Sequence, residues 1–409
     1  MSGPVRDAGA VTAGPRPPEV LFVGHEATRT GAPLMLLHFL RWLRAETDLS
    51  FEIVLLDGGP LVAEFREVAP TRVLADLRDS GWSRRLERYR LGGLASVLRS
   101  VVARRWCAPY RRIPLVYCNS IRAIRILGLL GGGSRTVVSH VHELELAISV
   151  STAPAERELL LTRPDRYVAA SDLVKQNLVD NHGLDPDRIA RHYEFIDVAA
   201  FTPGPSTGLA DLRRDLGIPS DAAVVGAVGV AEPRKAPDLF LQLALELRRR
   251  DLGRPVHLVW VGAEPEADGT RWMAHDIGHA GLGDLVHVVG SQASPARFFE
   301  LFDVLALTSR EDPFPLVCLE SSLLGTPILC FPNTGMAEFV GDDENGVVVP
   351  YLDLHAMADA IEDLLADPAR LEAMGARASV AVRDHHDVTV GAPALYADLR
   401  AWLAEAPGA

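Results

Sequence analysis

The sequence alternates short apolar runs with longer segments of helical spacing, and this alternation constrains the fold more than any other feature. In the first half of the chain, runs rich in β-branched residues and bounded by turn residues predict strands. Their bounds are Val20–Gly24, Phe51–Leu56, Leu115–Cys118, Thr136–Val141 and Arg166–Ala170. The helices predicted between and after them are Ala32–Ala45, Leu94–Trp106, Ile121–Leu130, Pro154–Leu161 and Asp172–His182. This order predicts a parallel sheet covered by helices on both faces.

A second series of the same kind follows Asp197 and the Pro/Gly-rich segment Phe201–Gly208. Its predicted strands are Ala223–Val228, Val256–Val261, Leu285–Val289, Val304–Thr308 and Pro327–Phe331. Its predicted helices are Pro237–Arg249, Thr270–Ala280, Pro295–Leu301, Leu316–Leu324 and Asp353–Leu365, and helical sequence continues from Pro368 to Ala404. We therefore expect an α/β fold of two Rossmann-like, doubly wound domains, residues 19–200 and 201–385, with a flexible tail before them (1–18) and a closing helix after them (386–409).

Composition and charge exclude several classes of protein. With 48% hydrophobic and 23% charged residues, the chain is globular. It contains neither an apolar run of about 18 residues nor a secretory signal, so we expect a cytoplasmic protein. A net charge of −13 argues against nucleic-acid binding. The stretch Arg78–Arg125 holds twelve arginines against two acidic residues, and it predicts peripheral contact with the anionic inner face of a membrane or with an acidic acceptor; a solvated surface is the alternative.

Loops at the carboxyl ends of strands bind ligands in open α/β sheets, and two facing domains would enclose a cleft. The first such loop, His25–Pro33, contains Gly31 and opens a helix, which suits an anion, although an ordinary turn is the alternative. It lacks the G-x-G-x-x-G pattern, which disfavours an NAD-dependent dehydrogenase. His140 and His142 lie on one side of a later strand. Only Glu143 is near in sequence to complete a metal site, so no metal is expected, and His142 is the better candidate to reach the cleft.

A second candidate loop, Gly229–Pro237, joins a strand to a helix and contains Arg234 and Lys235. The chain has only one other lysine, Lys175, so a lysine at this position is notable. Two cations beside a helix N-terminus can hold a diphosphate, the arginine as a fork and the lysine as a point charge. A solvated Arg–Lys pair is the alternative.

The third candidate loop, Thr308–Pro315, precedes a helix and carries the sharpest signal. Glu311 and Asp312 lie beside the helix start, where the positive end of the dipole favours ionised carboxylates, so simple capping is the alternative for both. Glu320 lies about a turn into the apolar helix Leu316–Leu324, where a carboxylate has no structural reason to be. From there it could accept hydrogen bonds from a pair of vicinal hydroxyls.

Taken together, these segments resemble the nucleotide-sugar glycosyltransferases of the GT-B fold, and specifically glycosyltransferase family 4. The resemblance extends from Val20 to Ala404 and rests on the Gly31 loop, the His142 segment, the Arg234–Lys235 pair and the segment 309–327. In the last of these, Asp312 and Glu320 have the spacing of the family's E-x7-E signature, and Gly325–Thr326–Pro327 follows it.

The resemblance implies a retaining transfer from a UDP- or GDP-sugar to an acceptor that the sequence does not identify, without a bound metal or cofactor. It implies that Arg234 and Lys235 hold the diphosphate and that Glu320 binds the ribose hydroxyls. Either Asp312 or Glu311 would meet the transferred sugar. The remaining implied contacts are Gly31 and the amides of Leu316 and Val317 near the diphosphate, His142 near the sugar, Gly290 beside the base, and a helix near Pro393–Leu403 crossing back to the first domain.

Departures from the family pattern leave alternatives open. The first signature glutamate is replaced by Asp312, and Pro315 and Ala236 stand where the family often has glycine. Proline lacks an N–H, so one backbone contact to the sugar is lost. The competing hypotheses are a catalytically silent GT-B scaffold that binds a nucleotide, and another GT-B enzyme such as a sugar-nucleotide epimerase or a pseudo-glycosyltransferase.

Overall fold

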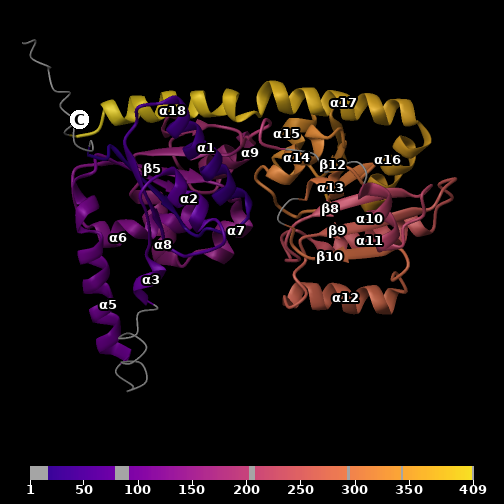
Figure 1. Cartoon of the computed structure of the whole chain (residues 1–409), viewed down its shortest axis with the longest axis horizontal. Coiled ribbons are helices and arrows are strands. Elements are labelled where there is room, and N and C mark those ends of the chain that lie inside the picture. Colours follow the sequence, from indigo (N-terminus) through magenta and orange to yellow (C-terminus); the bar gives the residue numbers. More distant parts are fainter. Residues whose placement is uncertain (1–16, 79–91, 202–207, 293–294, 342–343, 408–409) are drawn as a thin grey trace, which may run out of the picture.

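Two parallel sheets, each covered by helices, form two lobes side by side (Figure 1). The computed structural model describes residues 17–78, 92–201, 208–292, 295–341 and 344–407. The first sheet has seven strands in the order β3-β2-β1-β4-β5-β6-β7, and the second has six in the order β10-β9-β8-β11-β12-β13. Every registered strand pair is parallel. The predicted doubly wound α/β architecture is therefore confirmed.

The N-lobe comprises the elements from β1 to β7. Its strands are β1 (Val20–Gly24), β2 (Phe51–Leu55), β3 (Thr71–Val73), β4 (Leu115–Asn119), β5 (Thr136–Val141), β6 (Arg166–Ala169) and β7 (Ile189–Arg191). Its helices are α1 (Gly31–Glu46), α2 (Val62–Val68), α3 (Ala75–Arg78), α5 (Gly92–Trp106), α6 (Leu127–Leu130), α7 (Glu145–Ser151), α8 (Pro154–Thr162) and α9 (Asp172–Asp180). Short 3₁₀ helices lie at Ala108–Arg112, Ile121–Ile126 and Pro186–Arg188.

The C-lobe comprises the elements from α10 to α17. Its strands are β8 (Ala223–Val228), β9 (Val256–Val261), β10 (Val286–Val289), β11 (Val304–Leu307), β12 (Ile328–Cys330) and β13 (Gly346–Val348). Its helices are α10 (Leu209–Leu216), α11 (Pro237–Arg248), α12 (Asp268–Ala280), α13 (Ala296–Phe299), α14 (Leu316–Leu323), α15 (Met336–Val340), α16 (Leu354–Ala366) and α17 (Pro368–His385). The last helix, α18 (Val388–Ala404), belongs to neither sheet.

The sequence analysis missed three strands, and all three lie at sheet edges. β3, β7 and β13 have three residues each. Central strands such as β1, β5 and β9 are buried along their whole length and therefore read as continuous apolar runs. The edge strands are only partly buried, so they lack that signal. Most of the Pro/Gly-rich segment 201–208 lies outside the described residues.

Each sheet has a point where its strand order reverses, and these points position the site. The reversal lies between β1 and β4 in the N-lobe and between β8 and β11 in the C-lobe. Ligands of open α/β sheets bind at such switch points, beyond the carboxyl ends of the strands. The loops after β8 and β11 are 229–236 and 308–315, which contain the cations and carboxylates singled out above.

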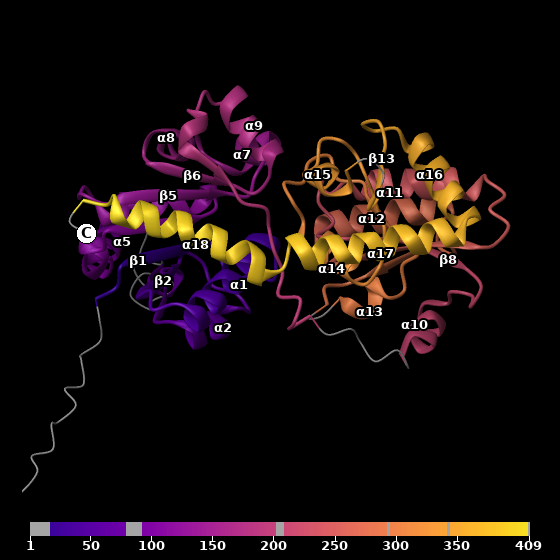
Figure 2. The same cartoon turned by 90° about the horizontal axis from the view of Figure 1, so that it is seen from above.

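The last two helices run across both lobes (Figure 2). The helix α17 packs on α14, and α18 packs on α1 of the N-lobe. The predicted helical stretch is broken at His386 and Asp387, because the backbone there pairs with Ile196: the Ile196 amide donates to the His386 carbonyl at 2.9 Å, and the Val388 amide donates to the Ile196 carbonyl at 2.8 Å. The two crossings between the lobes therefore lie side by side and are hydrogen-bonded.

The basic stretch Arg78–Arg125 is only partly described. Residues 79–91 lie outside the described ranges, and α5 follows them at the side of the N-lobe remote from the C-lobe (Figure 1). Within the described part of the chain, no helix combines the length and the apolar character that a membrane crossing requires.

Candidate functional site

The candidate site in the C-lobe is built from the two loops at its switch point. The loop after β8 is tied to the loop after β11 by the Arg310 amide, which donates to the Arg234 carbonyl at 2.8 Å. The Trp260 indole fixes the start of the first loop by donating to the Gly229 carbonyl at 2.9 Å. These bonds bring side chains that are 77 residues apart in sequence into one cluster.

Lys235 and Asp312 form the centre of this cluster. The Lys235 Nζ donates to the Asp312 Oδ2 at 2.5 Å, and Ser309 Oγ donates to the same oxygen at 3.1 Å. The two charged side chains are 13% and 6% exposed. Burial opposes ionisation of Asp312, but the neighbouring Lys235 and Arg234 outweigh it and hold the pKa of the carboxyl below its ordinary value. Lys235 has further N–H groups for a second anion.

Arg234 lies beside this pair and is held in a fixed orientation. Its guanidinium reaches the Glu232 carboxylate at 2.9 Å, the Glu311 carbonyl at 3.1 Å and Asp312 Oδ1 at 3.5 Å. Its side chain is 27% exposed, and burial is outweighed by Asp312 and Glu232, which raise its pKa. Two permanent cations are thus preorganised at the end of β8, as the diphosphate interpretation requires.

Two backbone positions let the loops approach this closely. Ala236 has φ 56° and ψ 56°, the left-handed region that favours glycine, at the cap of α11. This is one of the two positions where the family resemblance leads us to expect glycine. Gly335 donates its amide to the Asp312 carbonyl at 2.8 Å, and a Cβ on it would lie 1.7 Å from the Pro313 carbonyl oxygen. The site therefore contains strain at Ala236 and requires glycine at Gly335.

The helix α14 begins directly after this cluster. Pro315 is its cap residue, and neither Glu311 nor Asp312 caps it. The amides of Leu316 and Val317 belong to its first turn, where N–H groups have no partner within the helix. Glu320 lies one turn further on, and burial raises the pKa of its carboxyl to about 8. A carboxyl that keeps its proton near neutral pH can release that proton when a ligand binds and then accept hydrogen bonds from the ligand's hydroxyls.

Gly290 follows β10, at the edge of the sheet away from the β8–β11 switch point. It is partly buried, and its carbonyl accepts from Gln292 Nε2 at 3.1 Å. Gly290 thus lies at the carboxyl ends of the strands, as the loop carrying Lys235 does, but two strands away from it. The two residues are not in contact.

In the N-lobe, His142 is held between two acceptors. Its Nδ1 lies 2.6 Å from Glu194 Oε1, and its Nε2 lies 3.0 Å from Asn119 Oδ1. Asn119 donates its Nδ2 to the Ala32 carbonyl at 2.9 Å, which fixes its Oδ1 as the atom facing His142. Both ring nitrogens therefore face acceptor oxygens, an arrangement that favours the doubly protonated ring. Although burial alone would lower the pKa of His142, the Glu194 carboxylate raises it.

The same contacts connect His142 to the loop containing Gly31. Gly31 is exposed at the start of α1, and a Cβ there would meet open space. Because Asn119 bridges the carbonyl of Ala32 and the ring of His142, the first loop and the end of β5 form one hydrogen-bonded unit. The two predicted N-lobe residues are thus brought together through a residue that the sequence analysis did not name.

A metal-ligand set was also considered at this position. His140, His142 and Glu194 each offer one ligand atom within 4.8 Å of the others, which adds Glu194 to the pair weighed from the sequence. The rings of His140 and His142, however, are tilted by 37° with centroids 3.9 Å apart, and both nitrogens of His142 are occupied by hydrogen bonds. Three protein ligands with an open position are the minimum for zinc, and this arrangement leaves two.

Glu311 lies apart from the Lys235 cluster and joins the lobes instead. Its carboxylate accepts from the amides of Leu146, at 2.9 Å to each oxygen, and Ala147 at 3.4 Å, in the first turn of α7. Glu338 acts in the same way on α9, accepting from the amides of Asp172 and Leu173 at 2.9 and 2.8 Å. Two carboxylates of the C-lobe therefore cap two helices of the N-lobe.

An aromatic stack lies beside these contacts at the junction of the lobes. Phe314, Tyr193 and His386 are in mutual ring contact, with centroids 5.0, 5.2 and 5.6 Å apart. Burial lowers the pKa of His386 to about 4, so its ring is neutral near pH 7. The segment that carries Asp312 is thus anchored to both crossings between the lobes.

Sequence reasoning missed Asn119, Glu194 and Glu338. Glu194 carries a signal that could have found it, since it is an acidic residue in the otherwise apolar run 193–196, the same reasoning that singled out Glu320. Asn119 ends β4 at the switch point and could have been found from its position. Glu338 has no such signal, because its partners are backbone amides of the other lobe.

The sequence is similar to those of known glycosyltransferases. Residues 210–380 match the family described as glycosyl transferases group 1. The D-inositol 3-phosphate glycosyltransferase of Kineococcus radiotolerans is 33% identical over 264 residues, which cover 60% of this chain and 60% of that protein. The enzyme of the same name from Gordonia bronchialis is 34% identical over 230 residues, 53% of this chain and 48% of that one. The matched region thus spans less than two thirds of the length of these relatives.

Solved structures show the same architecture over nearly the whole chain. The Anabaena protein HepE, solved in complex with UDP and glucose, has a TM-score of 0.76 and 19% identity and covers 93% of this chain and 99% of its own. Sucrose-phosphate synthase from Thermosynechococcus elongatus has a TM-score of 0.73 and 19% identity and covers 96% and 100%. The fold is therefore GT-B.

Proposed function

We propose that this chain, whose residues 210–380 belong to the group 1 glycosyl transferases, transfers a sugar from a UDP- or GDP-sugar to an acceptor. In this proposal the anomeric configuration is retained and no bound metal takes part. The donor is held by the C-lobe, and the acceptor enters from the side of the N-lobe.

The observation that carries the proposal is the cluster at the β8–β11 switch point. Lys235 and Arg234 converge there on Asp312, directly before the first turn of α14. Two side-chain cations and a set of helix amides at one place suit a diphosphate, which carries several negative charges. Asp312 orients Lys235 without exhausting it, because an ammonium has three donors and this carboxylate takes one.

In the proposed reaction this cluster stabilises the leaving group, which is the nucleoside diphosphate. The C1–O bond of the donor would break with its electron pair left on the diphosphate, while the acceptor oxygen bonds to C1 from the same face and passes its proton to the departing diphosphate oxygen. Lys235, Arg234 and the amides of Leu316 and Val317 would take up the developing negative charge on the diphosphate. Each such preorganised contact is worth about 2–4 kcal/mol of the barrier.

The other predicted residues have supporting places in this scheme. Glu320 would exchange its proton for hydrogen bonds from the ribose hydroxyls. His142 is poorly placed to act as a base, because both its ring nitrogens are engaged by Glu194 and Asn119. It would instead place a fixed positive charge on the N-lobe wall of the cleft, opposite the donor.

One observation favours a second function, a nucleotide-binding scaffold without turnover. Asp312, which would meet the transferred sugar, is engaged by Lys235 and Ser309 and is 4% exposed. If those bonds persist with donor bound, the sugar lacks a carboxylate partner and only the nucleotide is recognised.

Donor hydrolysis without an acceptor separates the two functions. A panel of UDP- and GDP-sugars would be incubated with the protein, and the released nucleoside diphosphate measured by chromatography. UDP-sugars are the first to test, since HepE was solved with UDP-glucose as well as with UDP. Release of diphosphate from one donor supports the transferase. Binding of UDP with no release from any donor would establish the scaffold instead.

A further inference from the structure

A cavity of about 550 Å³ lies between the lobes, beside the donor cluster. One wall comes from the start of α7 and from α9 in the N-lobe, and the other comes from residues that follow β11, β12 and β13. Figure 2 shows α7 and α9 on the side of the N-lobe that faces α15. The lining includes Arg310 and Glu311, which directly precede Asp312 in the chain, so the cavity adjoins the donor site.

The charge of the lining is negative. The lining holds three carboxylates, those of Glu145, Asp180 and Glu311, and one guanidinium, that of Arg310. Glu311 is bound by the amides of α7, and Glu145 lies 2.8 Å from His182 Nε2. The Arg310 guanidinium is already neutralised, because its two terminal nitrogens reach the two carboxylate oxygens of Asp238 at 2.9 and 2.7 Å. Among the described lining residues there is no other cation. A phosphate would therefore meet net repulsion here and would find no free cation to bind it.

Hydrogen-bonding groups without partners line the same cavity. Asn177 is 9% exposed, and its Nδ2 has no hydrogen-bond partner among the described residues. Asn333 Oδ1 on the opposite wall is likewise buried without a partner there. A buried amide group left unpaired costs about 1–3 kcal/mol, so a ligand hydroxyl that reached either group would recover that cost.

Two exposed apolar side chains complete the cavity. Leu146 of the N-lobe is 40% exposed, and Tyr351 of the C-lobe is 49% exposed, and both belong to the lining. Apolar walls combined with a few fixed polar groups are typical of sites for small molecules. A ring with C–H faces and hydroxyl edges has the matching distribution of apolar and polar surface.

We propose that this cavity is the acceptor subsite and that it takes a hydroxyl-rich ring without phosphate, a neutral cyclitol or pyranoside. This inference rests on the proposed transferase function, and it separates this chain from its curated relatives, whose names specify an inositol phosphate. Asn177 and Asn333 would hydrogen-bond the hydroxyls, and Asp180 would accept from a further one.

The test compares one ring with and without phosphate, using myo-inositol and its monophosphate as probes. Binding to the full-length protein saturated with UDP would be followed by saturation-transfer NMR, which does not depend on activity. The account predicts that myo-inositol binds at least tenfold more tightly than the monophosphate. Tighter binding of the monophosphate, or no binding of either probe, would overturn the proposal.

Variants locate the binding in this cavity. Asn177→Leu is expected to weaken myo-inositol binding about tenfold, which is the cost of one unpaired buried group. Asp180→Lys is expected to move the preference toward the monophosphate. The matched control is Glu158→Lys, the same charge change at an exposed position of α8 outside the lining. If all three variants bind both probes like the native protein, the cavity is not the subsite.

Donor hydrolysis without an acceptor is measured in parallel on the same samples. Hydrolysis together with binding of the monophosphate alone refutes the subsite and leaves the transferase function intact. Binding of myo-inositol that the variants alter, with no hydrolysis of any donor, refutes the transferase function and leaves the subsite as a binding site for polyols. The two failures are therefore distinguishable.

Discussion

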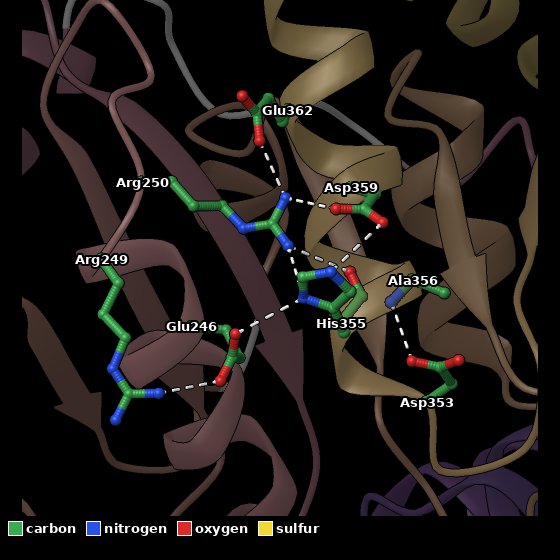
Figure 3. Close-up of polar contacts among 8 residues, drawn as sticks. All are labelled: Glu246, Arg249, Arg250, Asp353, His355, Ala356, Asp359 and Glu362. Carbon is green, nitrogen blue, oxygen red and sulfur yellow. Dashed lines mark hydrogen bonds and ion pairs between the residues drawn. The ribbon is translucent and has the colours of Figure 1, made fainter.

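The two ends of helix α11 carry cations in opposite circumstances. Arg234 and Lys235 precede its first turn and face the cleft, while Arg249 and Arg250 follow its last turn, on the side where α11 packs against α16. Figure 3 shows the second group, in which Arg250 lies between carboxylates of α16. Both ends contain charged pairs with short contacts, so distance alone does not separate a site from a structural network.

At the C-terminal end, both terminal nitrogens of the Arg250 guanidinium have partners, one in two carboxylates of α16 and the other in His355. Arg250 reaches Asp359 and Glu362 at 2.6 and 2.8 Å and also donates to the His355 carbonyl at 3.3 Å (Figure 3). The arginine is 12% exposed, but its acidic partners are 54% and 43% exposed, so solvent screens the pairs. The charge of Arg250 is thus matched by two carboxylates, whereas Lys235 faces one.

At the N-terminal end, the balance is reversed. Lys235 has one carboxylate oxygen for three donors, and the carboxylate itself is 6% exposed. The backbone there is strained at Ala236, and the buried Glu320 carboxyl has its pKa raised to about 8. Incomplete pairing, strain and a shifted pKa at one place distinguish a binding site from a stabilising network.

Among the substitutions that test this difference between the two ends, the one at Lys235 should have the largest effect. Lys235→Met removes a charge from the diphosphate site, and we expect donor hydrolysis and transfer to fall about 10²–10³-fold, because preorganised charge at the leaving group is lost. Because Asp312 loses its ammonium partner while buried, the thermal midpoint should also fall, so turnover is compared at a temperature where every variant is folded. Arg250→Met is the matched control and should keep native turnover. Equal activity of both variants would remove the distinction between the two ends.

Glu320→Gln separates binding from stability. UDP affinity should fall about tenfold or more, since the ribose hydroxyls lose a charged acceptor. The native carboxyl has a folded pKa of about 8 against an ordinary value of 4.5, so the free energy of unfolding should decrease as pH rises from 4.5 to 8. The variant lacks this decrease and should be the more stable protein at pH 8, which chemical denaturation at several pH values can measure.

The pH dependence of UDP affinity shows whether UDP binds the ionised or the protonated form of Glu320 more tightly. If the nucleotide prefers ionised Glu320, native affinity should increase as pH rises toward 8 and then level off. Glu320→Gln serves as the control for the titration of the ligand itself. An equal slope in both proteins would mean that Glu320 does not titrate on binding.

Glu194→Gln tests the ion pair between Glu194 and His142 in the N-lobe. Without the Glu194 charge, burial dominates and the pKa of His142 falls, so we expect the alkaline limb of the activity profile to begin at lower pH, with turnover reduced about tenfold at neutral pH. The ¹⁵N shifts of the His142 ring report the loss of one proton. The control is Asp398→Asn, which removes the partner of another histidine, His192, at 2.8 Å. Unaltered His142 shifts would contradict the ion pair.

Arg250→Met has a smaller effect, confined to stability. Removing the arginine leaves Asp359 and Glu362 facing each other, and we expect a loss of about 1–2 kcal/mol in the free energy of unfolding. The loss should shrink in high salt, since the partners are exposed. A change in UDP affinity instead would mean that this network is coupled to the site.

Ala236→Gly has the smallest expected effect. Relief of the left-handed conformation, worth about 1–2 kcal/mol, is offset by the loss of a buried methyl group and by the greater backbone entropy of glycine. The net change in unfolding free energy should stay within about 1 kcal/mol. A large loss would show that Ala236 is held by packing and carries little strain.

The sequence was sufficient for the central strands and for the cations and acids of the switch-point loops. A buried parallel strand such as β9 is a continuous apolar run, and Lys235 is notable in a chain with two lysines. The loop geometry was not predictable, because the Lys235–Asp312 bond joins residues 77 apart. Nor was the place of Glu311 on α7, since its partners are backbone amides that carry no sequence signal.

The most direct measurement of the central claim is a calorimetric cycle that pairs UMP and UDP with the native protein and Lys235→Met. The claim is that Lys235 contributes to binding the diphosphate together with Arg234 and the α14 amides, so the advantage of UDP over UMP should be at least tenfold in the native protein and several-fold smaller in the variant. An unchanged advantage in Lys235→Met would show that the diphosphate is bound elsewhere.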